Sequence, residues 1–246
     1  RRRTLHALIG PNGAGKTSAF NLISGMAAPS RGTVMLGAEN IAGLPPEAVC
    51  RRGLARSFQI TNLFPALSVG ENLRLGVQAT HKSRFNPWIE AGTIANINAE
   101  TAAIARFLGV SGMEEAEAGA LSYGGQRVLD MGLAISSKPR ILLLDEPLAG
   151  LAAAERERIG NLIRKIADDI PVLLVEHDID RVFDMADAVT VMNGGEVLVD
   201  GTVEETRNDV RVQEIYIGSG VAALAARDLA SAAKPEVLMS MRDIDT

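Results

Sequence analysis

Cysteine, tryptophan and long apolar runs are scarce in this 246-residue chain. Cys50 is the only cysteine, so no disulfide can form within the chain, which is compatible with a reducing compartment. No apolar run approaches the roughly 20 residues that a membrane-spanning helix needs, and no signal-peptide pattern opens the sequence. We therefore expect any role at a membrane to depend on a partner protein.

An excess of basic residues is also missing. The 25 lysines and arginines are outnumbered by 30 aspartates and glutamates, which gives a formal net charge of −5. This balance argues against a broad nucleic-acid-binding surface. Hydrophobic residues make up 47% of the chain and charged residues 22%, as in an ordinary globular protein of one or two domains.

A glycine-rich stretch near the start of the chain carries the strongest signal. Glycine, four residues and then Gly-Lys-Thr is the pattern of a phosphate-binding loop. The glycines allow a tight turn with inward N–H groups, Lys16 offers a charge to phosphates, and Thr17 offers a hydroxyl to Mg²⁺. A strand at 5–9 and a helix at 16–24 flank the loop, so the helix N-terminus faces the anion. The predicted phosphate contacts are Gly10, Pro11, Asn12, Gly13, Ala14, Gly15, Lys16, Thr17 and Ser18.

Two adjacent carboxylates follow an apolar run at 141–144, which reads as a buried parallel strand. A Mg²⁺-dependent nucleotide hydrolase needs one acid for the metal and another to orient or deprotonate the attacking water. We assign Asp145 to the first role and Glu146 to the second. A strand-end turn that happens to carry two acids is the alternative.

A second candidate anion site lies at 121–126, Leu-Ser-Tyr-Gly-Gly-Gln. A serine cap and two glycines open a helix that runs to about residue 136, and such an N-terminus can bind phosphate. The chain already has one phosphate loop, so two such elements suggest a nucleotide held between two copies. A simple capping turn is the alternative. The predicted contacts here are Ser122, Gly124, Gly125 and Gln126.

Strands and helices alternate along most of the chain, which predicts an α/β fold with a mostly parallel sheet and right-handed crossovers. Between about 63 and 121 no strand signal appears, so we expect a helical subdomain at about 63–136. The strands are expected at 5–9, 33–36, 54–58, 141–144, 172–175, 189–192 and 196–199. The subdomain helices are expected at 68–75, 98–108, 114–118 and 122–136, with an irregular insertion at 80–97. Further helices are expected at 152–168, 179–186 and 203–217.

These motifs, in this order, resemble those of the nucleotide-binding domain of ATP-binding cassette (ABC) ATPases. Lys16 and Thr17 match the family's Walker A loop, and Asp145-Glu146 match its Walker B motif. Residues 121–126 match the signature motif, with Tyr123 where glycine is commoner. The resemblance covers residues 5–218 and implies a RecA-like P-loop NTPase fold with an inserted helical subdomain.

Two further residues gain a role from this resemblance. Gln59 stands where the family has its Q-loop glutamine, and His177 where it has its switch histidine. The resemblance implies that Gln59 senses the γ-phosphate and Mg²⁺ and passes closure to a membrane partner. It implies that Glu146 is the general base, that His177 contacts the γ-phosphate, and that ATP and Mg²⁺ are required. It assigns the metal to Thr17, Gln59 and Asp145.

Within the family the chain looks most like the ATP-binding subunit of branched-chain amino acid importers. The resemblance lies in segments 55–59, 80–97, 146–151 and 214–218. It implies a head-to-tail dimer of ABC domains, membrane permease subunits, an indirect extracytoplasmic binding protein and no nucleic acid. The expected location is peripheral, on the cytoplasmic face of the inner membrane. Urea or amide importers and the lipopolysaccharide exporter ATPase look similar, and a soluble non-transport ABC protein or a module without turnover are further alternatives.

Three features depart from the family pattern. The antiparallel strands and the adenine-stacking aromatic that precede the phosphate loop are missing, and Ala152-Ala153 replace a usually polar D-loop. Past the ABC domain at 1–220, residues 221–246 read as an alanine-rich linker and a strand. We expect this strand to open a second ABC domain in a tandem protein. Pairing of that strand with its own domain, or a disordered tail, are the alternatives.

Overall fold

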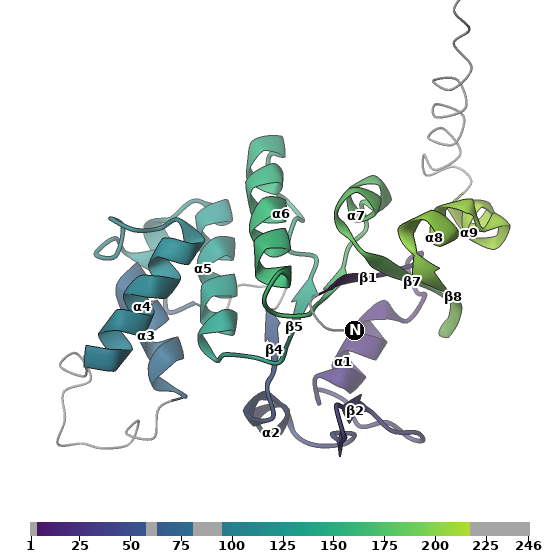
Figure 1. Cartoon of the computed structure of the whole chain (residues 1–246), viewed down its shortest axis with the longest axis horizontal. Coiled ribbons are helices and arrows are strands. Elements are labelled where there is room, and N and C mark those ends of the chain that lie inside the picture. The colour runs from purple at the N-terminus through teal and green to yellow at the C-terminus, as the bar shows by residue number, and fades with distance from the viewer. Residues whose placement is uncertain (1–3, 58–62, 81–94, 217–246) are drawn as a thin grey trace, which may run out of the picture.

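The computed structural model of the chain describes residues 4–57, 63–80 and 95–216 (Figure 1). Gln59, Trp88, most of the irregular insertion and the segment 221–246 lie outside the described residues. The predictions made for them therefore stay predictions. In the described ranges no helix is both long and apolar enough to cross a membrane.

A six-stranded sheet forms the centre of the fold, in the order β4-β5-β6-β1-β7-β8. The first five strands run parallel and β8 pairs antiparallel with β7, so the predicted mostly parallel sheet is confirmed. The loop between β7 and β8 is Gly194-Gly195, and both glycines have positive φ, as a two-residue hairpin requires. The strands are β1 (Leu5–Ile9), β4 (Leu54–Ser57), β5 (Ile141–Asp145), β6 (Val172–Val175), β7 (Ala188–Asn193) and β8 (Glu196–Thr202).

Helices cover both faces of this sheet (Figure 1). Alternate residues of a strand point to opposite faces. Leu142 and Leu144 pack in the same cluster as Ile163 of α6, whereas Leu143 between them packs in the cluster of Phe20 of α1. The helices are α1 (Lys16–Ile23), α2 (Pro46–Arg51), α3 (Val69–Gln78), α4 (Ala95–Leu108), α5 (Tyr123–Ser136), α6 (Ala153–Ala167), α7 (Ile179–Met185), α8 (Val203–Asn208) and α9 (Val210–Tyr216).

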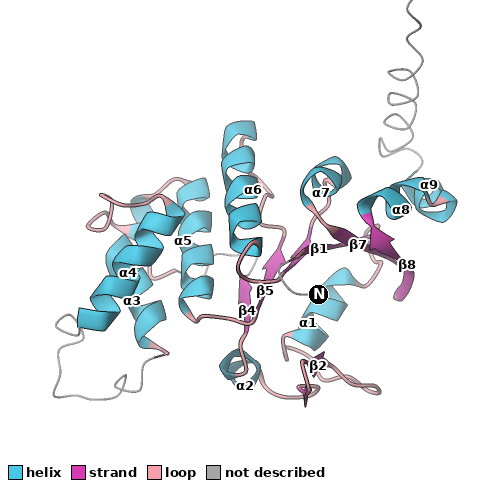
Figure 2. Cartoon of the chain, viewed as in Figure 1, coloured by secondary structure: helices cyan, strands magenta, loops and turns pink. Residues whose placement is uncertain are grey.

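A helical part, made of α3, α4 and α5, lies at the β4 end of the sheet (Figure 2). Leu73, Leu108 and Leu129 join its helices in the main hydrophobic cluster. Ser57 at the end of β4 hydrogen-bonds Asp130 of α5, which ties this part to the sheet. The sequence between β4 and β5 thus forms the inserted helical subdomain that the fold class predicts.

The prediction of a helix at 114–118 is wrong. The segment forms turns and a bridge to Ser68, followed by a short 3₁₀ helix, η2 (Ala118–Ala120). Its backbone carbonyls instead accept hydrogen bonds from the N-terminus of α3. The Gly70 N–H donates to the Glu114 carbonyl at 2.8 Å, and the Val69 N–H donates to the Ala116 carbonyl at 2.9 Å. Helix N-termini leave such N–H groups without partners in their own helix.

Three further predictions need correction. The strand at 33–36 shrinks to β2 (Met35–Leu36), which pairs antiparallel with an unexpected β3 (Glu39–Asn40). Helix α4 begins at Ala95, inside the predicted irregular insertion, because Ile97 joins the buried stripe of that helix. The single helix expected at 203–217 is two helices, α8 and α9, which meet at Asp209.

Candidate nucleotide-binding site

The phosphate loop, Asp145, Glu146 and His177 gather at one edge of the sheet, the carboxyl ends of its parallel strands. The phosphate loop follows β1, Asp145 ends β5, and His177 lies two residues beyond β6. Ligands of open α/β sheets bind at this edge because the loops and helix N-termini that follow the strands meet there. Three segments that are far apart in sequence therefore meet at this edge of the sheet.

The phosphate loop has a backbone that only glycine suits at its two ends. Gly10 has φ 155°, and a Cβ there would lie 2.3 Å from the carbonyl oxygen of Met192. Gly15, with φ 97°, is the N-cap of α1 and has no side chain to cap the helix. The first N–H groups of α1 are thus open to an anion.

Lys16 is the cation of this loop, and it is buried, with 6% of its surface exposed. Its Nζ donates to the carbonyls of Gly10 at 2.7 Å and Pro11 at 3.1 Å. Burial lowers the pKa of Lys16, and the charge of Glu146 raises it. Among the described residues no carboxylate forms an ion pair with Lys16, so a phosphate group fits as its counter-ion.

Asp145 and Thr17 are the described candidates for the metal. Thr17 is exposed on the first turn of α1, and the Asp145 side chain is 13% exposed at the end of β5. Magnesium is usually held by one or two protein oxygens together with substrate phosphates and water, so one hydroxyl and one carboxylate fit it. The third predicted ligand, Gln59, lies outside the described residues.

Glu146 and His177 are in direct contact. Oε1 of Glu146 lies 2.6 Å from Nε2 of His177, and the His177 side chain is half exposed. The contact arises because β5 and β6 are neighbours, with Asp145 opposite Val175. Glu146 has φ 48°, a left-handed conformation that costs a non-glycine residue on the order of 1–3 kcal/mol. Its N–H donates to the Val175 carbonyl at 2.9 Å, which helps to hold this backbone.

Two charged residues of this edge were missed by the sequence analysis. Glu176 is buried and accepts a hydrogen bond from the Leu148 N–H at 2.9 Å. Burial raises the pKa of Glu176, the N–H donors lower it, and the charge of Glu146 adds to the rise. The Arg56 side chain, on β4, is 7% exposed and donates to Asp145 at 2.7 Å. The available signal was a charged residue inside or just after an apolar strand. We call Arg56, Asp145, Glu146, Glu176 and His177 the strand-end cluster.

The β7–β8 hairpin supports the phosphate loop from the other side. Gly195 N–H donates to the Ala14 carbonyl at 3.1 Å, and a Cβ on Gly15 would lie 3.3 Å from Gly195. No sequence pattern pointed to this contact, because Ala14 and Gly195 are neighbours in space but lie far apart in the sequence. A side chain on Gly15 would therefore crowd the hairpin, whereas a Cβ on Gly195 would meet no heavy atom within 4 Å.

The signature segment lies elsewhere, at the N-terminus of α5 in the helical part, away from α1 (Figure 1). Ser122 caps α5 by accepting from the Gly125 N–H at 3.1 Å, and its hydroxyl lies 3.3 Å from Glu155. Gln126 donates to the Leu121 carbonyl at 3.2 Å, and Gly124 is buried. Within one copy, then, this second anion-binding element is on a different part of the molecule from the phosphate loop.

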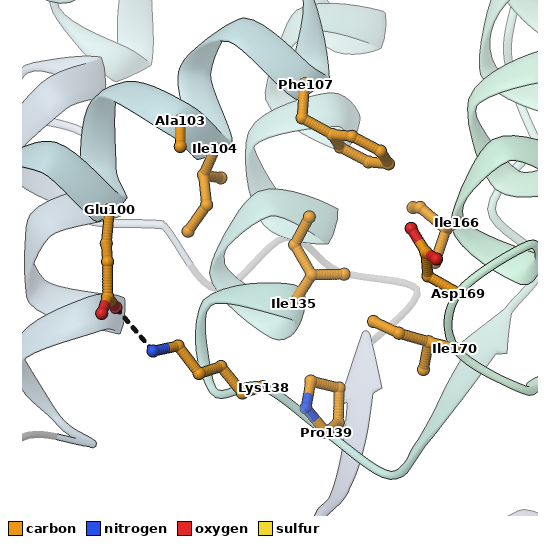
Figure 3. Close-up of a pocket in the computed structure, with 10 residues that line it drawn as sticks. All are labelled: Glu100, Ala103, Ile104, Phe107, Ile135, Lys138, Pro139, Ile166, Asp169 and Ile170. Carbon is orange, nitrogen blue, oxygen red and sulfur yellow. Dashed lines mark ion pairs between the residues drawn. The ribbon is translucent and has the colours of Figure 1, made fainter.

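An apolar pocket in the structure contains none of the predicted site residues (Figure 3). Ile104, Phe107, Ile135 and Ile170 point into it, with a Glu100–Lys138 ion pair of 2.8 Å at its rim. Its lining includes Pro139 and Ile170, each two residues before β5 or β6, so it lies toward the amino ends of these strands. That is the opposite edge from the strand-end cluster.

Comparisons with known proteins identify the family of the chain and its fold. A model of the ABC transporter family matches residues 1–149. The chain belongs to this family. An ABC domain is an ATPase, so the chain is an ATP-hydrolysing enzyme.

Individual relatives extend the match over most of the chain. The high-affinity branched-chain amino acid transport ATP-binding protein BraF of Pseudomonas aeruginosa is 38% identical over 223 residues, 86% of each chain. The corresponding LivG of Escherichia coli is 34% identical over 219 residues, again 86% of each chain. A crystal structure of the ADP conformation of an ATP-binding cassette of an ABC transporter is 29% identical, with a TM-score of 0.76 over 88% of this chain and 89% of that one.

Proposed function

We propose that this ABC ATPase couples ATP hydrolysis to the import of branched-chain or related amino acids through a membrane permease. The similarity to BraF and LivG over most of the chain supports this substrate class. The observation that carries the hydrolytic role is the 2.6 Å contact between Glu146 and His177. It pairs a carboxylate with an imidazole at the edge of the sheet where the phosphate loop follows β1.

The phosphate loop would hold the ATP phosphates. Its backbone N–H groups and the N-terminus of α1 supply hydrogen-bond donors. Buried Lys16 supplies a positive charge, and no carboxylate among the described residues forms an ion pair with it. Thr17, Gln59 and Asp145 would hold Mg²⁺, which neutralises charge on the phosphate oxygens when it is bound.

Glu146 would act as the general base. Its side chain lies beyond β5 and its charge acts on Lys16, which supports a position near the phosphates. His177 would orient the Glu146 carboxylate through the 2.6 Å contact and would contact the γ-phosphate. A positioned base of this kind contributes about 10²- to 10⁴-fold to a rate.

A second ABC domain would complete the site. Ser122, Gly124, Gly125 and Gln126 open α5, a helix of 14 residues whose dipole favours an anion at that end. Because α5 and α1 lie on different parts of one copy, we infer that the signature of one domain faces the phosphate loop of another. The second domain is another copy, a related subunit or a fused neighbour.

The remaining partners follow from the transport role. The permease subunits would dock on the chain at the cytoplasmic face of the inner membrane, so the chain would be peripheral. An extracytoplasmic binding protein would deliver the amino acid to the permease and would not touch this chain. No nucleic acid is expected.

Reconstitution with the co-purified permease subunits tests this proposal. The expected result is ATP-dependent uptake of leucine, isoleucine or valine into proteoliposomes, which is lost in Glu146→Gln and kept in Glu157→Gln. Glu157 is the matched control because it is exposed on α6. Uptake of urea or an amide alone would refute the substrate class but leave the ATPase assignment standing, whereas full uptake by Glu146→Gln would refute the role of the base.

A further inference from the structure

Arg56 is an unusual residue for its place in the fold. It is the third residue of β4, the edge strand next to β5, and its side chain is only 7% exposed. A buried guanidinium keeps its charge and must therefore be surrounded by acceptors. Those acceptors identify what the residue does.

The guanidinium contacts two separate motifs of the site. Nη2 donates to Oδ2 of Asp145 at 2.7 Å. Nη1 donates to Oδ1 of Asn21 at 2.8 Å and to Oγ of Ser24 at 2.9 Å. The group also lies 5.5 Å from the ring centre of Phe20. Phe20, Asn21 and Ser24 belong to the helix segment that leads on from the phosphate loop, so Arg56 links this segment to the metal-binding aspartate.

The strand register explains why this arginine reaches Asp145. Arg56 pairs with Leu143 of β5, and register partners in a parallel pair point to the same face of the sheet. Asp145 is two residues beyond Leu143 and points to that face as well. Leu143 packs in the cluster of Phe20, so this face is the one that α1 covers. The link is therefore a consequence of the register rather than a flexible surface contact.

We propose that Arg56 is the positioning residue of the metal-binding carboxylate, an inference that rests on the proposed role of Asp145 in holding Mg²⁺. Arg56 uses one oxygen, Oδ2, and no other side chain in the described ranges forms a hydrogen bond or ion pair with this carboxylate. The other oxygen is thus available to a metal or its water, and the carboxylate is fixed in one orientation relative to α1. Partners of this kind typically change metal affinity by about 10- to 100-fold when they are removed.

Binding of a fluorescent ATP analogue to the full chain, titrated with Mg²⁺, tests this role without relying on turnover. Arg56→Met is expected to raise the half-saturating Mg²⁺ concentration by about 10- to 100-fold. Its affinity for the analogue in EDTA is expected to stay within about twofold of wild type, since phosphate contacts are made by the loop itself. Arg56→Lys, which keeps the charge but not the fork of donors, is expected to recover part of the loss. Arg158→Met, at an exposed arginine of α6, is the control.

The outcomes separate the proposal from its foundation. If Asp145→Asn raises the Mg²⁺ requirement and Arg56→Met does not, or lowers it, the positioning role is refuted and the metal assignment stands. Equal loss of affinity with and without Mg²⁺ in Arg56→Met also refutes it, because that is a structural effect. If Asp145→Asn changes nothing, both assignments fail. Should Arg56→Met not fold, Asn21→Ala gives the test through α1, with a smaller rise expected and an unchanged Mg²⁺ requirement refuting the link.

Discussion

The phosphate loop and the strand-end cluster lie at the same edge of the sheet, but they are built in different ways. The loop is one continuous segment whose shape is set by its backbone, with glycine at φ 155° and 97° at its two ends. The cluster takes one side chain from β4, two from the end of β5 and the next residue, and two from just beyond β6. It exists only when these strands pair in register. A locally encoded site should therefore respond to backbone substitutions, and an assembled one to changes in side-chain chemistry.

The largest effect on nucleotide affinity is expected from Gly10→Ala, which changes the backbone of the loop. The added Cβ would lie 2.3 Å from the Met192 carbonyl oxygen, so the loop or the β7–β8 hairpin must move. Overpacking of this kind costs about 1–3 kcal/mol, which corresponds to roughly 5- to 150-fold in nucleotide affinity. Equilibrium binding of an ATP analogue measures it. Wild-type affinity in a folded Gly10→Ala variant would show that the loop tolerates a side chain.

A smaller effect is expected from His177→Ala, which attacks the cluster. The variant loses the 2.6 Å contact to Glu146, and a hydrogen bond to a charged group contributes about 1.5–3 kcal/mol. We expect kcat for ATP hydrolysis to fall about 10- to 100-fold while nucleotide affinity stays close to wild type. Asp178→Ala is the neighbouring control, since it removes the cap of α7 but spares the contact. A similar loss of kcat in both variants would argue against a specific role of the imidazole.

A pH-dependent effect on stability is expected at Glu176. Burial raises the folded-state pKa of Glu176 above the ordinary value of 4.5. Between pH 4.5 and this raised pKa, the folded chain therefore binds more protons than the unfolded chain. The stability that this provides is fully present below pH 4.5 and is lost as the pH rises through the raised pKa. Glu176→Gln keeps an acceptor for Leu148 and lacks the titration. Its free energy of unfolding, from urea titrations, should therefore gain on wild type as the pH rises, and a pH-independent difference would contradict this.

The smallest effect is expected from Gly160→Ala in α6, a glycine outside both regions. No heavy atom lies within 4 Å of a Cβ built there, and the residue is in a helix interior. Alanine should stabilise the fold by about 0.5–1 kcal/mol, read from the same urea titrations, without changing ATP hydrolysis. A loss of stability would mean that α6 needs this glycine.

What the sequence predicted follows the same division. The phosphate loop, its strand and its helix were predicted because the pattern, the glycines and the flanks lie within 20 residues. The strands β5, β6 and β7 were predicted because their apolar runs are buried on both faces. The turns at 114–118 were not, since their backbone bonds to α3 across about 45 residues. The links from Arg56 to Asp145 and from Glu176 to Leu148 depend on strand register, which no local pattern in the sequence specifies.

The role of Glu146 as general base is the central claim, and a comparison of ATP hydrolysis by wild type and Glu146→Gln tests it most directly. Glutamine keeps the shape of the side chain and removes its ability to accept a proton. We predict that kcat falls about 10²- to 10⁴-fold, that ATP still binds, and that Glu157→Gln matches wild type. Equal rates of hydrolysis in wild type and Glu146→Gln would contradict the assignment.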